Sequence, residues 1–238
     1  AAHGPGLRGL ARRTGGRDRL NGAVARSGSR QRWLRALRGA AWVLVLVVTA
    51  VLALQLSYFA RVLWWNQFDP GTTRFMALEL ERLRRTDPRR ELQHRWVPYG
   101  QISAHLKRAV IAAEDANFTG HDGVDWDAIE RAWEQNLQRG RVVRGGSTIT
   151  MQLAKNLFLS GERSYLRKVQ EVVISYMIET VMNKRRILEL YLNVAEWGVG
   201  VFGAEAGARH HYGVSAAPLA PWQAPRMAAM LPRPSYYD

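Results

Sequence analysis

An uncharged run of 22 residues, 39–60, constrains this chain more than any other feature of its sequence. Arg38 and Arg61 bracket the run, and its centre, residues 41–54, is apolar apart from Thr49. A run of this length can cross a bilayer as one helix. A helix also satisfies its backbone groups internally, as a hydrocarbon environment requires. The sequence therefore predicts a transmembrane helix over residues 39–60.

A cleaved signal peptide and a buried core helix are the alternatives for this run. Val51-Leu52-Ala53 weakly resembles a cleavage site, but the apolar run continues beyond it and a long segment precedes it. Both features favour a retained anchor.

Residues 1–38 are strongly basic, with ten Arg and a single acid, Asp18. The segment is rich in Gly and Ser and has no apolar period, so we expect it to be disordered. An RNA-binding arm is one interpretation of such a tail. The neighbouring apolar run favours a cytoplasmic flank by the positive-inside rule, without a nucleic-acid partner, and places residue 61 onward outside. An interfacial aromatic belt is expected at the far end of the run, from Tyr58, Phe59, Trp64, Trp65 and Phe68.

Beyond the membrane, residues 61–95 are expected to form a linker and membrane-proximal segment, and residues 96–238 a mainly helical domain. Apolar residues recur at helical spacing, and Ser or Asp precedes several of these stretches as a possible N-cap. Expected helices are 75–85, those that follow the caps Ser103, Asp125, Ser147 and Ser164, and 184–193. The apolar stripe of the helix after Ser164 is expected to comprise Leu166, Val169, Val173, Tyr176 and Met177. The chain has no Cys, which excludes disulfides and thiolate metal sites.

Two adjacent carboxylates, Glu114 and Asp115, end the apolar run 109–113. Burial raises the pKa of a carboxyl group toward the range that a general base or acid needs. Glu114 is therefore a candidate catalytic residue, and Glu171, which lies downstream behind a basic stretch, is a second candidate. The alternative is that both acids form a solvated helix end, because structural ion pairs imitate functional sites.

A basic cluster follows downstream, beside several polar side chains and one further acid, Glu171. Its cations are Lys155, Arg163, Arg167 and Lys168, and its polar neighbours are Ser147, Thr148, Gln152 and Asn156. Helix N-terminal amides with Lys and Arg suit a phosphate or pyrophosphate. No nucleotide P-loop is present, so a lipid-linked pyrophosphate is the better match. The alternative is a solvated helix face with ordinary salt bridges.

Metal binding has little support in the sequence. His121 stands alone and His210-His211 are adjacent, so structural roles are favoured for them. Glu114 could still recruit a divalent cation, Mg²⁺ or Mn²⁺, onto a pyrophosphate. No organic cofactor is expected. The apolar knot 157–159 is expected either to pack in the core or to dip into the lipid headgroups.

Four motifs in order resemble the peptidoglycan glycosyltransferases, which are the transglycosylase domains of class A penicillin-binding proteins and their monofunctional relatives. The motifs are Glu114-Asp115-x-x-Phe118-x-x-His121-x-Gly123, the stretch 146–156, Arg167-Lys168-x-x-Glu171, and Lys184-x-x-Ile187-Leu188-Glu189-x-Tyr191-Leu192-Asn193. No transpeptidase domain follows, so the monofunctional form is the one resembled. Met151 departs from the family, which usually has Gln there. The chain also ends at Asp238, where members of the family continue into a further basic segment.

The resemblance implies a lysozyme-like, two-lobed helical domain with one N-terminal transmembrane helix in the cytoplasmic membrane. It implies polymerisation of glycan strands from lipid II, with Glu114 as the base on the acceptor 4-hydroxyl and inversion at the donor carbon. Glu171 would orient basic groups or a metal. Lys155, Arg163 and Lys168 would stabilise the departing pyrophosphate, and the other polar residues of the cluster would bind substrate. Other cell-wall synthesis or division proteins are the partners that the family suggests.

A lytic transglycosylase or lysozyme-type hydrolase is the alternative enzyme, since it also uses carboxylates in a helical cleft. It has no need of a pyrophosphate site. A membrane-anchored interaction protein is the non-enzymatic alternative, and it would not depend on Glu114.

Overall fold

The computed structural model describes residue 1 and residues 15–141, 145–162 and 164–238, with side chains for Trp33 and from Arg35 onward. The chain divides into two compact units, Ala1–Gln55 and Leu56–Asp238. Arg163, one of the predicted pyrophosphate residues, lies outside the described residues.

Helix α1, Gly15–Gln67, contains the predicted membrane span. Its segment Arg35–Gln67 is long and apolar enough to cross a membrane by length and composition, and side chains 35–54 are exposed. The structure differs from the prediction upstream, where residues 15–38 are helical instead of disordered. Helix nucleation is the costly step, so an apolar helix can extend into an Arg-rich flank at little cost.

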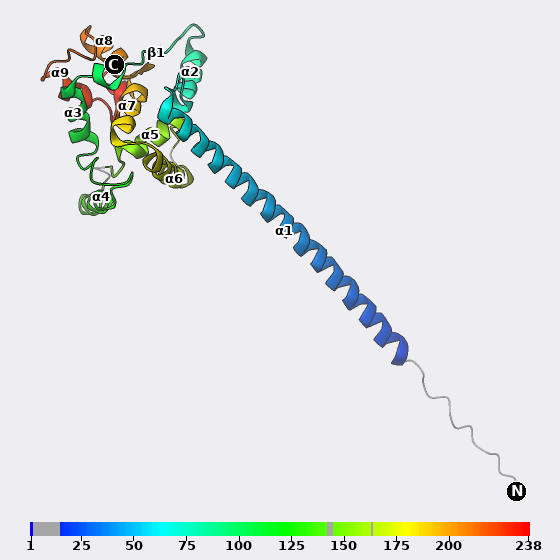
Figure 1. Ribbon diagram of the computed structural model, residues 1–238. Coiled ribbons are helices and arrows are strands. Elements are labelled where there is room, and N and C mark those ends of the chain that lie inside the picture. The colour runs from blue at the N-terminus through cyan, green and yellow to red at the C-terminus, as the bar shows by residue number, and fades with distance from the viewer. Residues whose placement is uncertain (2–14, 142–144, 163) are drawn as a thin grey trace. The chain divides into compact units, whose positions relative to one another are not determined.

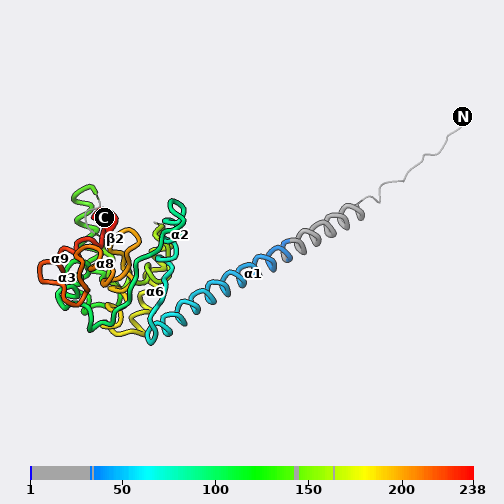
Figure 2. The backbone as a smooth tube through the Cα atoms, turned by 90° about the horizontal axis from the view of Figure 1, so that it is seen from above, coloured from blue at the N-terminus to red at the C-terminus, as the bar shows by residue number. Residues whose placement is uncertain are grey.

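The second unit holds the remaining elements, and most of them are helices (Figures 1 and 2). The helices are α2 (Arg74–Thr86), α3 (Ala104–Glu114), α4 (Trp126–Gln138), α5 (Ile149–Phe158), α6 (Tyr165–Val181), α7 (Lys184–Val194), α8 (Ala204–Tyr212) and α9 (Gln223–Ala228). Short 3₁₀ turns occupy Tyr99–Gln101 and Pro234–Tyr236. The mainly helical, lysozyme-like fold that the sequence predicts is confirmed.

Helix α7 lies near the middle of this unit, with α3 and α9 on one side and α2 on the other (Figures 1 and 2). Its residues 190–194 are all buried, as are 149–151 at the start of α5. A small sheet adjoins it in the order β1-β3-β2, with β1 parallel and β2 antiparallel to β3. The strands are Gln93–His94, Glu196–Gly198 and Val201–Phe202. Strands of two or three residues have too few positions to show an alternating pattern in the sequence.

The predicted N-caps Ser103, Asp125 and Ser164 are confirmed, because each side chain accepts a hydrogen bond from an amide of the first turn. Ser147 is not the cap of α5. Thr148 has that role, and its side chain accepts from the amide of Met151. Both residues carry a hydroxyl, so the sequence alone did not distinguish them.

Residues 61–95 are not a separate linker, because they belong to the same compact unit as the rest of the domain. Val62 and Met76 are buried in its core, and β1 pairs with β3. The guanidinium of Arg186 on α7 donates to the carbonyl oxygens of Trp65 and Phe68 at the end of α1. These donors satisfy carbonyl groups that the end of a helix leaves unpaired.

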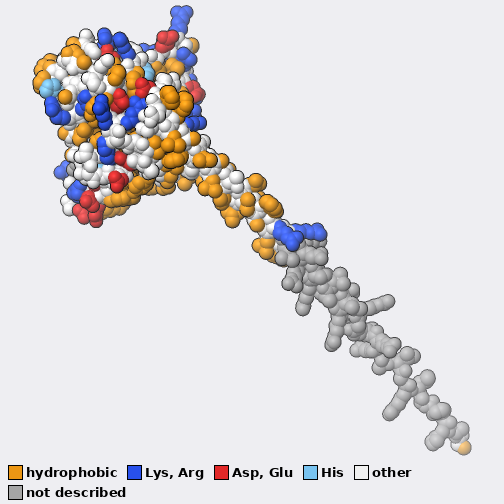
Figure 3. Space-filling model, viewed as in Figure 1, with side chains coloured by type: hydrophobic (Ala, Val, Ile, Leu, Met, Phe, Trp, Pro, Cys, Tyr) orange, Lys and Arg blue, Asp and Glu red, His pale blue; other side chains and the backbone are white. Residues whose placement is uncertain are grey.

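The apolar stripe predicted for α6 does not face the core. Leu166 is 84% exposed and Val169 is 62% exposed, whereas Glu171, Ile174 and Ser175 are buried. Helix α4 also exposes large apolar side chains, including Trp133 at 66%. Figure 3 shows hydrophobic side chains gathered along the edge of the unit that α4 and α6 form. A contiguous exposed apolar surface of this kind marks an interaction site.

The knot 157–159 packs in the core, which was one of its two predicted roles. Leu157 and Phe158 are buried. The Phe158 ring lies 5.2 Å from that of Tyr58 and 5.0 Å from that of Trp65, centroid to centroid. These contacts join α5 to the last turns of α1.

Candidate active site

Glu114 is the last residue of α3, and its half-buried carboxylate lines a cavity of about 470 Å³. The loop before α5 and its first turns line the same cavity with Ser147, Thr148 and Gln152. Burial raises the pKa of Glu114 above its ordinary value, while the Gln152 amide and the Lys155 charge oppose that rise. A carboxylate that is partly desolvated in a cavity is suited to accept a proton.

A hydrogen-bond chain orients the Glu114 carboxylate. The Gln152 side-chain amide donates to Glu114 Oε2 at 2.7 Å. Tyr191 of α7, which is fully buried, donates its hydroxyl to Gln152 Oε1 at 2.9 Å. Burial raises the pKa of Tyr191 well above its usual value, so this hydroxyl stays a donor. The Gln152 side chain is therefore fixed with its amide group toward the carboxylate.

Asp115 is buried beside Glu114 and connects three parts of the site. Its Oδ2 accepts from the Ile149 amide at 3.0 Å, and its Oδ1 accepts from His121 Nε2 at 3.0 Å. The Gly123 amide donates to His121 Nδ1 at 3.1 Å, which leaves the hydrogen of the neutral ring on Nε2. Asp115 thus ties the end of α3 to the start of α5 and to the loop between α3 and α4.

Gly123 is required for the geometry of that loop. Its φ is +95°, which side chains rarely adopt, and a Cβ there would lie 3.2 Å from the Ser175 carbonyl oxygen. Its carbonyl accepts from the Thr148 hydroxyl at 2.5 Å.

Asp115, His121 and Asp125 lie close enough together to suggest a metal site, with possible ligand atoms within 4.8 Å of one another. Those atoms already take part in hydrogen bonds inside the protein: Asp125 accepts from the Ala128 amide and from Asn117, and the Asp115–His121 pair is bonded as described above. The arrangement therefore suits a structural network better than a metal.

Glu171 is buried on α6 and is held by two of the predicted cations. Arg167 pairs with its Oε1, and Lys168 Nζ lies 2.9 Å from its Oε2. Lys168 also donates to the Ser147 hydroxyl at 2.6 Å. Burial, with the charges of Arg167 and Lys155, lowers the pKa of Lys168 to about 8.

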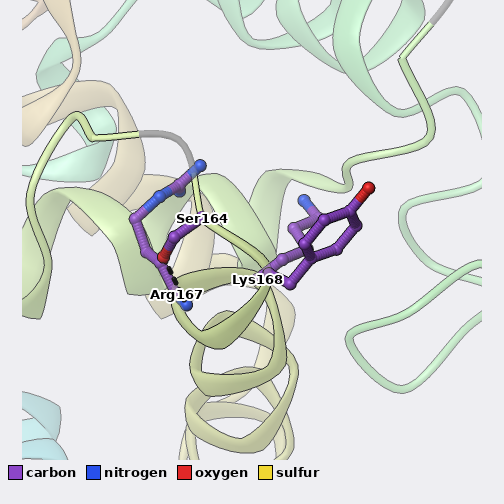
Figure 4. Close-up of a pocket in the computed structure, with 4 residues that line it drawn as sticks. Ser164, Arg167 and Lys168 are labelled. Atoms are coloured by element: carbon purple, nitrogen blue, oxygen red, sulfur yellow. Dashed lines mark hydrogen bonds between the residues drawn. The ribbon is translucent and has the colours of Figure 1, made fainter.

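Arg167 and Lys168 line an open hollow of about 480 Å³ together with Ser164 and Tyr165 (Figure 4). Since Ser147 lines the Glu114 cavity, the Lys168–Ser147 hydrogen bond marks where the cavity and the hollow adjoin. The structure thus brings Glu114 to one region with two of the predicted cations, Arg167 and Lys168.

Lys155 lies within this charged group, and its ammonium is 5.1 Å from the centroid of the Phe75 ring. Burial and the charge of Arg167 lower its pKa, whereas Glu196 and Glu114 raise it. Asn156, predicted to bind substrate, is buried at 5% exposure and lines neither of the two hollows. Met151 is also buried, so this position contributes packing here instead of a polar contact.

Sequence reasoning missed two groups that hold the site together. Tyr191 was named only as part of the fourth motif and was given no role, although its spacing in that motif could have indicated one. Lys184 was likewise not assigned a function. It donates to Glu179 and to the His121 carbonyl, and Glu179 accepts from the Thr150 hydroxyl. These contacts join α5, α6 and α7 to the first motif.

The comparisons with known proteins all identify the same family. The profile of the family described as Transglycosylase matches residues 80–238. Several relatives carry the name biosynthetic peptidoglycan transglycosylase. That of Janthinobacterium sp. (strain Marseille) is 59% identical over 197 residues, 83% of this chain and 85% of the relative. That of Bordetella pertussis is 61% identical over 213 residues, 88% and 87% of the two chains. That of Aromatoleum aromaticum is 56% identical over 203 residues, 85% and 88%. The chain therefore belongs to the transglycosylase family and is a peptidoglycan glycosyltransferase.

Proposed function

We propose that the enzyme extends glycan strands from lipid II and that Glu114 is its general base. In this mechanism Glu114 removes the proton of the acceptor 4-hydroxyl as that oxygen attacks the anomeric carbon of the donor chain. A hydroxyl is a poor nucleophile unless its proton is removed as it attacks. The bond to the pyrophosphate breaks with inversion, and undecaprenyl pyrophosphate leaves. The observation that carries the proposal is a desolvated carboxylate in a cavity that adjoins a group of cations.

The cations act on the leaving group. Lys155, Arg167 and Lys168 repel one another and lose hydration in the free enzyme, as the lowered pKa values of the two lysines indicate. A bound pyrophosphate dianion would offset both the mutual repulsion of these cations and their loss of hydration. Fixed cations that face developing charge stabilise the transition state more than the ground state. Glu171 has a supporting role, since it holds Arg167 and Lys168 in place.

No step of this mechanism is assigned to a metal. A divalent cation such as Mg²⁺ or Mn²⁺ would neutralise pyrophosphate charge, and the three basic side chains supply the same chemistry. Glu114, which the sequence offers as a ligand, already accepts a hydrogen bond from Gln152 on one oxygen.

The enzyme is proposed to sit in the cytoplasmic membrane with its N-terminus inside and residue 61 onward outside. The Arg-rich segment 1–38 supports this orientation. The exposed apolar surface of α4 and α6 is proposed to contact the lipid, which would place the site near the lipid tails of its substrate.

Replacing the base should stop polymerisation without preventing binding. Glu114→Gln keeps the shape of the side chain but cannot accept the proton, so turnover should fall roughly 10²–10⁴-fold. Glycan formation from labelled lipid II is measured in detergent, and lipid II affinity is measured separately. Glu81→Gln, on the solvent face of α2, is the matched control. Turnover near the parental rate in Glu114→Gln would remove Glu114 from the mechanism.

Removing a pyrophosphate cation should affect the rate more than the affinity. Lys155→Ala is expected to lower the single-turnover rate roughly 10²–10³-fold. Lys155→Arg should recover only part of that loss, because a planar fork replaces a compact charge. Circular dichroism checks that both variants fold. Parental rates in folded Lys155→Ala would show that Lys155 has no role at the leaving group.

Contact between α6 and the lipid can be tested directly because the chain has no Cys. A polarity-sensitive dye on Leu166→Cys should emit as in an apolar environment in proteoliposomes and be quenched by a lipid-borne quencher. The same dye on Arg226→Cys of α9, at the opposite end of the unit in Figure 1, should report water. An aqueous signal at Leu166 would contradict the proposed contact.

A further inference from the structure

Lys155 has a second carboxylate near it, besides Glu114, on an element that none of the four motifs covers. That carboxylate is Glu196 of β2. In the β2–β3 pairing, Glu196 is opposite Phe202. Side chains of directly opposed residues lie on the same face of a sheet. Glu196 and Phe202 therefore project toward the same side.

Two aromatic rings connect this side of the sheet to Lys155. The Phe202 ring lies 6.2 Å from the Phe75 ring, centroid to centroid. The Phe75 ring in turn lies 5.1 Å from the Lys155 ammonium. Glu196 thus belongs to a small apolar-walled group around Lys155. Low polarity of the surroundings strengthens the interaction between the two charges.

Helix α2 contributes a further charged pair to this group. Glu79 and Arg82 lie one and two turns after Phe75, on the same helix face, and Arg82 Nε donates to Glu79 at 2.8 Å. Burial and the charge of Glu79 raise the pKa of Glu196 to about 7, while the Gly200 amide, Arg82 and Lys155 oppose that rise. The charged groups that act on Lys155 itself are Arg167 of α6, Glu196 of β2 and Glu114 of α3.

We propose that Glu196 is a positioning residue for catalysis, whose carboxylate attracts the Lys155 ammonium and holds it toward the pyrophosphate of the substrate. Glu114 cannot supply this interaction throughout the reaction, because it becomes neutral when it takes the acceptor proton. Glu196 takes no part in that proton transfer, so above about pH 7 its charge persists. The inference rests on the proposed function in that Lys155 is taken as a pyrophosphate cation.

The ionisation of Glu196 determines the direction in which the pKa of Lys155 changes. Above about pH 7 Glu196 is ionised, and its charge then raises the pKa of Lys155. Below that pH Glu196 becomes neutral and no longer raises the pKa of Lys155. Removing the carboxylate should therefore make Lys155 lose its proton at a lower pH than in the parent.

The titration of Lys155 can be measured directly, because the chain has only four lysines: Lys107, Lys155, Lys168 and Lys184. Lysine labelled with ¹³C at the ε-carbon gives four signals in the full-length protein in detergent, and single replacements assign them. In Glu196→Gln the titration midpoint of Lys155 should move to lower pH. Glu196→Asp, which keeps the charge, should restore part of the shift. Glu81→Gln on α2 should leave it unchanged.

Lys168 provides an internal control within the same sample. Burial and the charges of Arg167 and Lys155 shift the pKa of Lys168, and Glu196 does not contribute to that shift. A general loosening of the site would shift the titration midpoints of both lysines, whereas loss of the proposed interaction would shift that of Lys155 much more. In the parent protein the Lys155 signal should also show a small step near pH 7, where Glu196 titrates, and this observation needs no variant to fold.

The kinetic counterpart is a shift in the alkaline limb of the pH–rate profile for lipid II polymerisation. Glu196→Gln should move that limb to lower pH, with a smaller effect at pH 7. An unchanged Lys155 midpoint in Glu196→Gln, or no step near pH 7 in the parent if that variant does not fold, would overturn the inference. Failure of the proposed function would look different, since Lys155→Ala would then retain the parental rate whatever the titrations show.

Discussion

The structure of the site depends on one buried carboxylate, Asp115, which must be satisfied without water. A buried charge is costly unless it is paired or hydrogen-bonded. Asp115 meets that requirement with the first amide of α5 and the His121 ring. The end of α3, the loop that follows it and the start of α5 are fixed to one another as a result. Glu114, the residue before Asp115, is thereby held where Gln152 of α5 can reach it.

The cations of the site differ from Asp115, because they are only partly paired. Glu171 accounts for Arg167 and Lys168, but Lys155 has no salt-bridge partner within 4 Å among the described residues. Their mutual repulsion is tolerated because an anionic substrate is expected to complete the site. Perturbed pKa values at functional sites commonly have this origin. Two of the four lysines of the chain, Lys155 and Lys168, belong to this group, where a compact, titratable charge differs from the planar guanidinium of Arg.

Much of the fold could be predicted from local signals. The apolar run, the caps at Ser103, Asp125 and Ser164 and the helix spacing are properties of short segments, and they were confirmed. The two carboxylates and the basic cluster were identified from residue type and order. The predictions that were wrong concern features that depend on tertiary packing. Helix α6 has two faces with apolar residues, and its periodicity could not show that the face with Glu171 and Ile174 is the buried one.

Long-range contacts explain the other differences. Residues 61–95 were interpreted as a linker because the strand that pairs with β1 is β3, which lies far along the chain at Val201–Phe202. Tyr191 acquires its role only when α7 packs against α5, and Glu196 only when the fold brings its charge near Lys155. A role that is defined by a neighbour distant in the chain cannot be derived from local spacing alone.

The most direct test of the account is the pH dependence of kcat/KM for lipid II polymerisation, with circular dichroism confirming the fold at each pH. Glu114 acts only when it is deprotonated, and burial raises its pKa above the ordinary value of 4.5. We therefore expect kcat/KM to fall as the pH falls through a midpoint above 4.5. A rate that stays constant down to pH 4.5 in folded protein would contradict a desolvated Glu114 as the base.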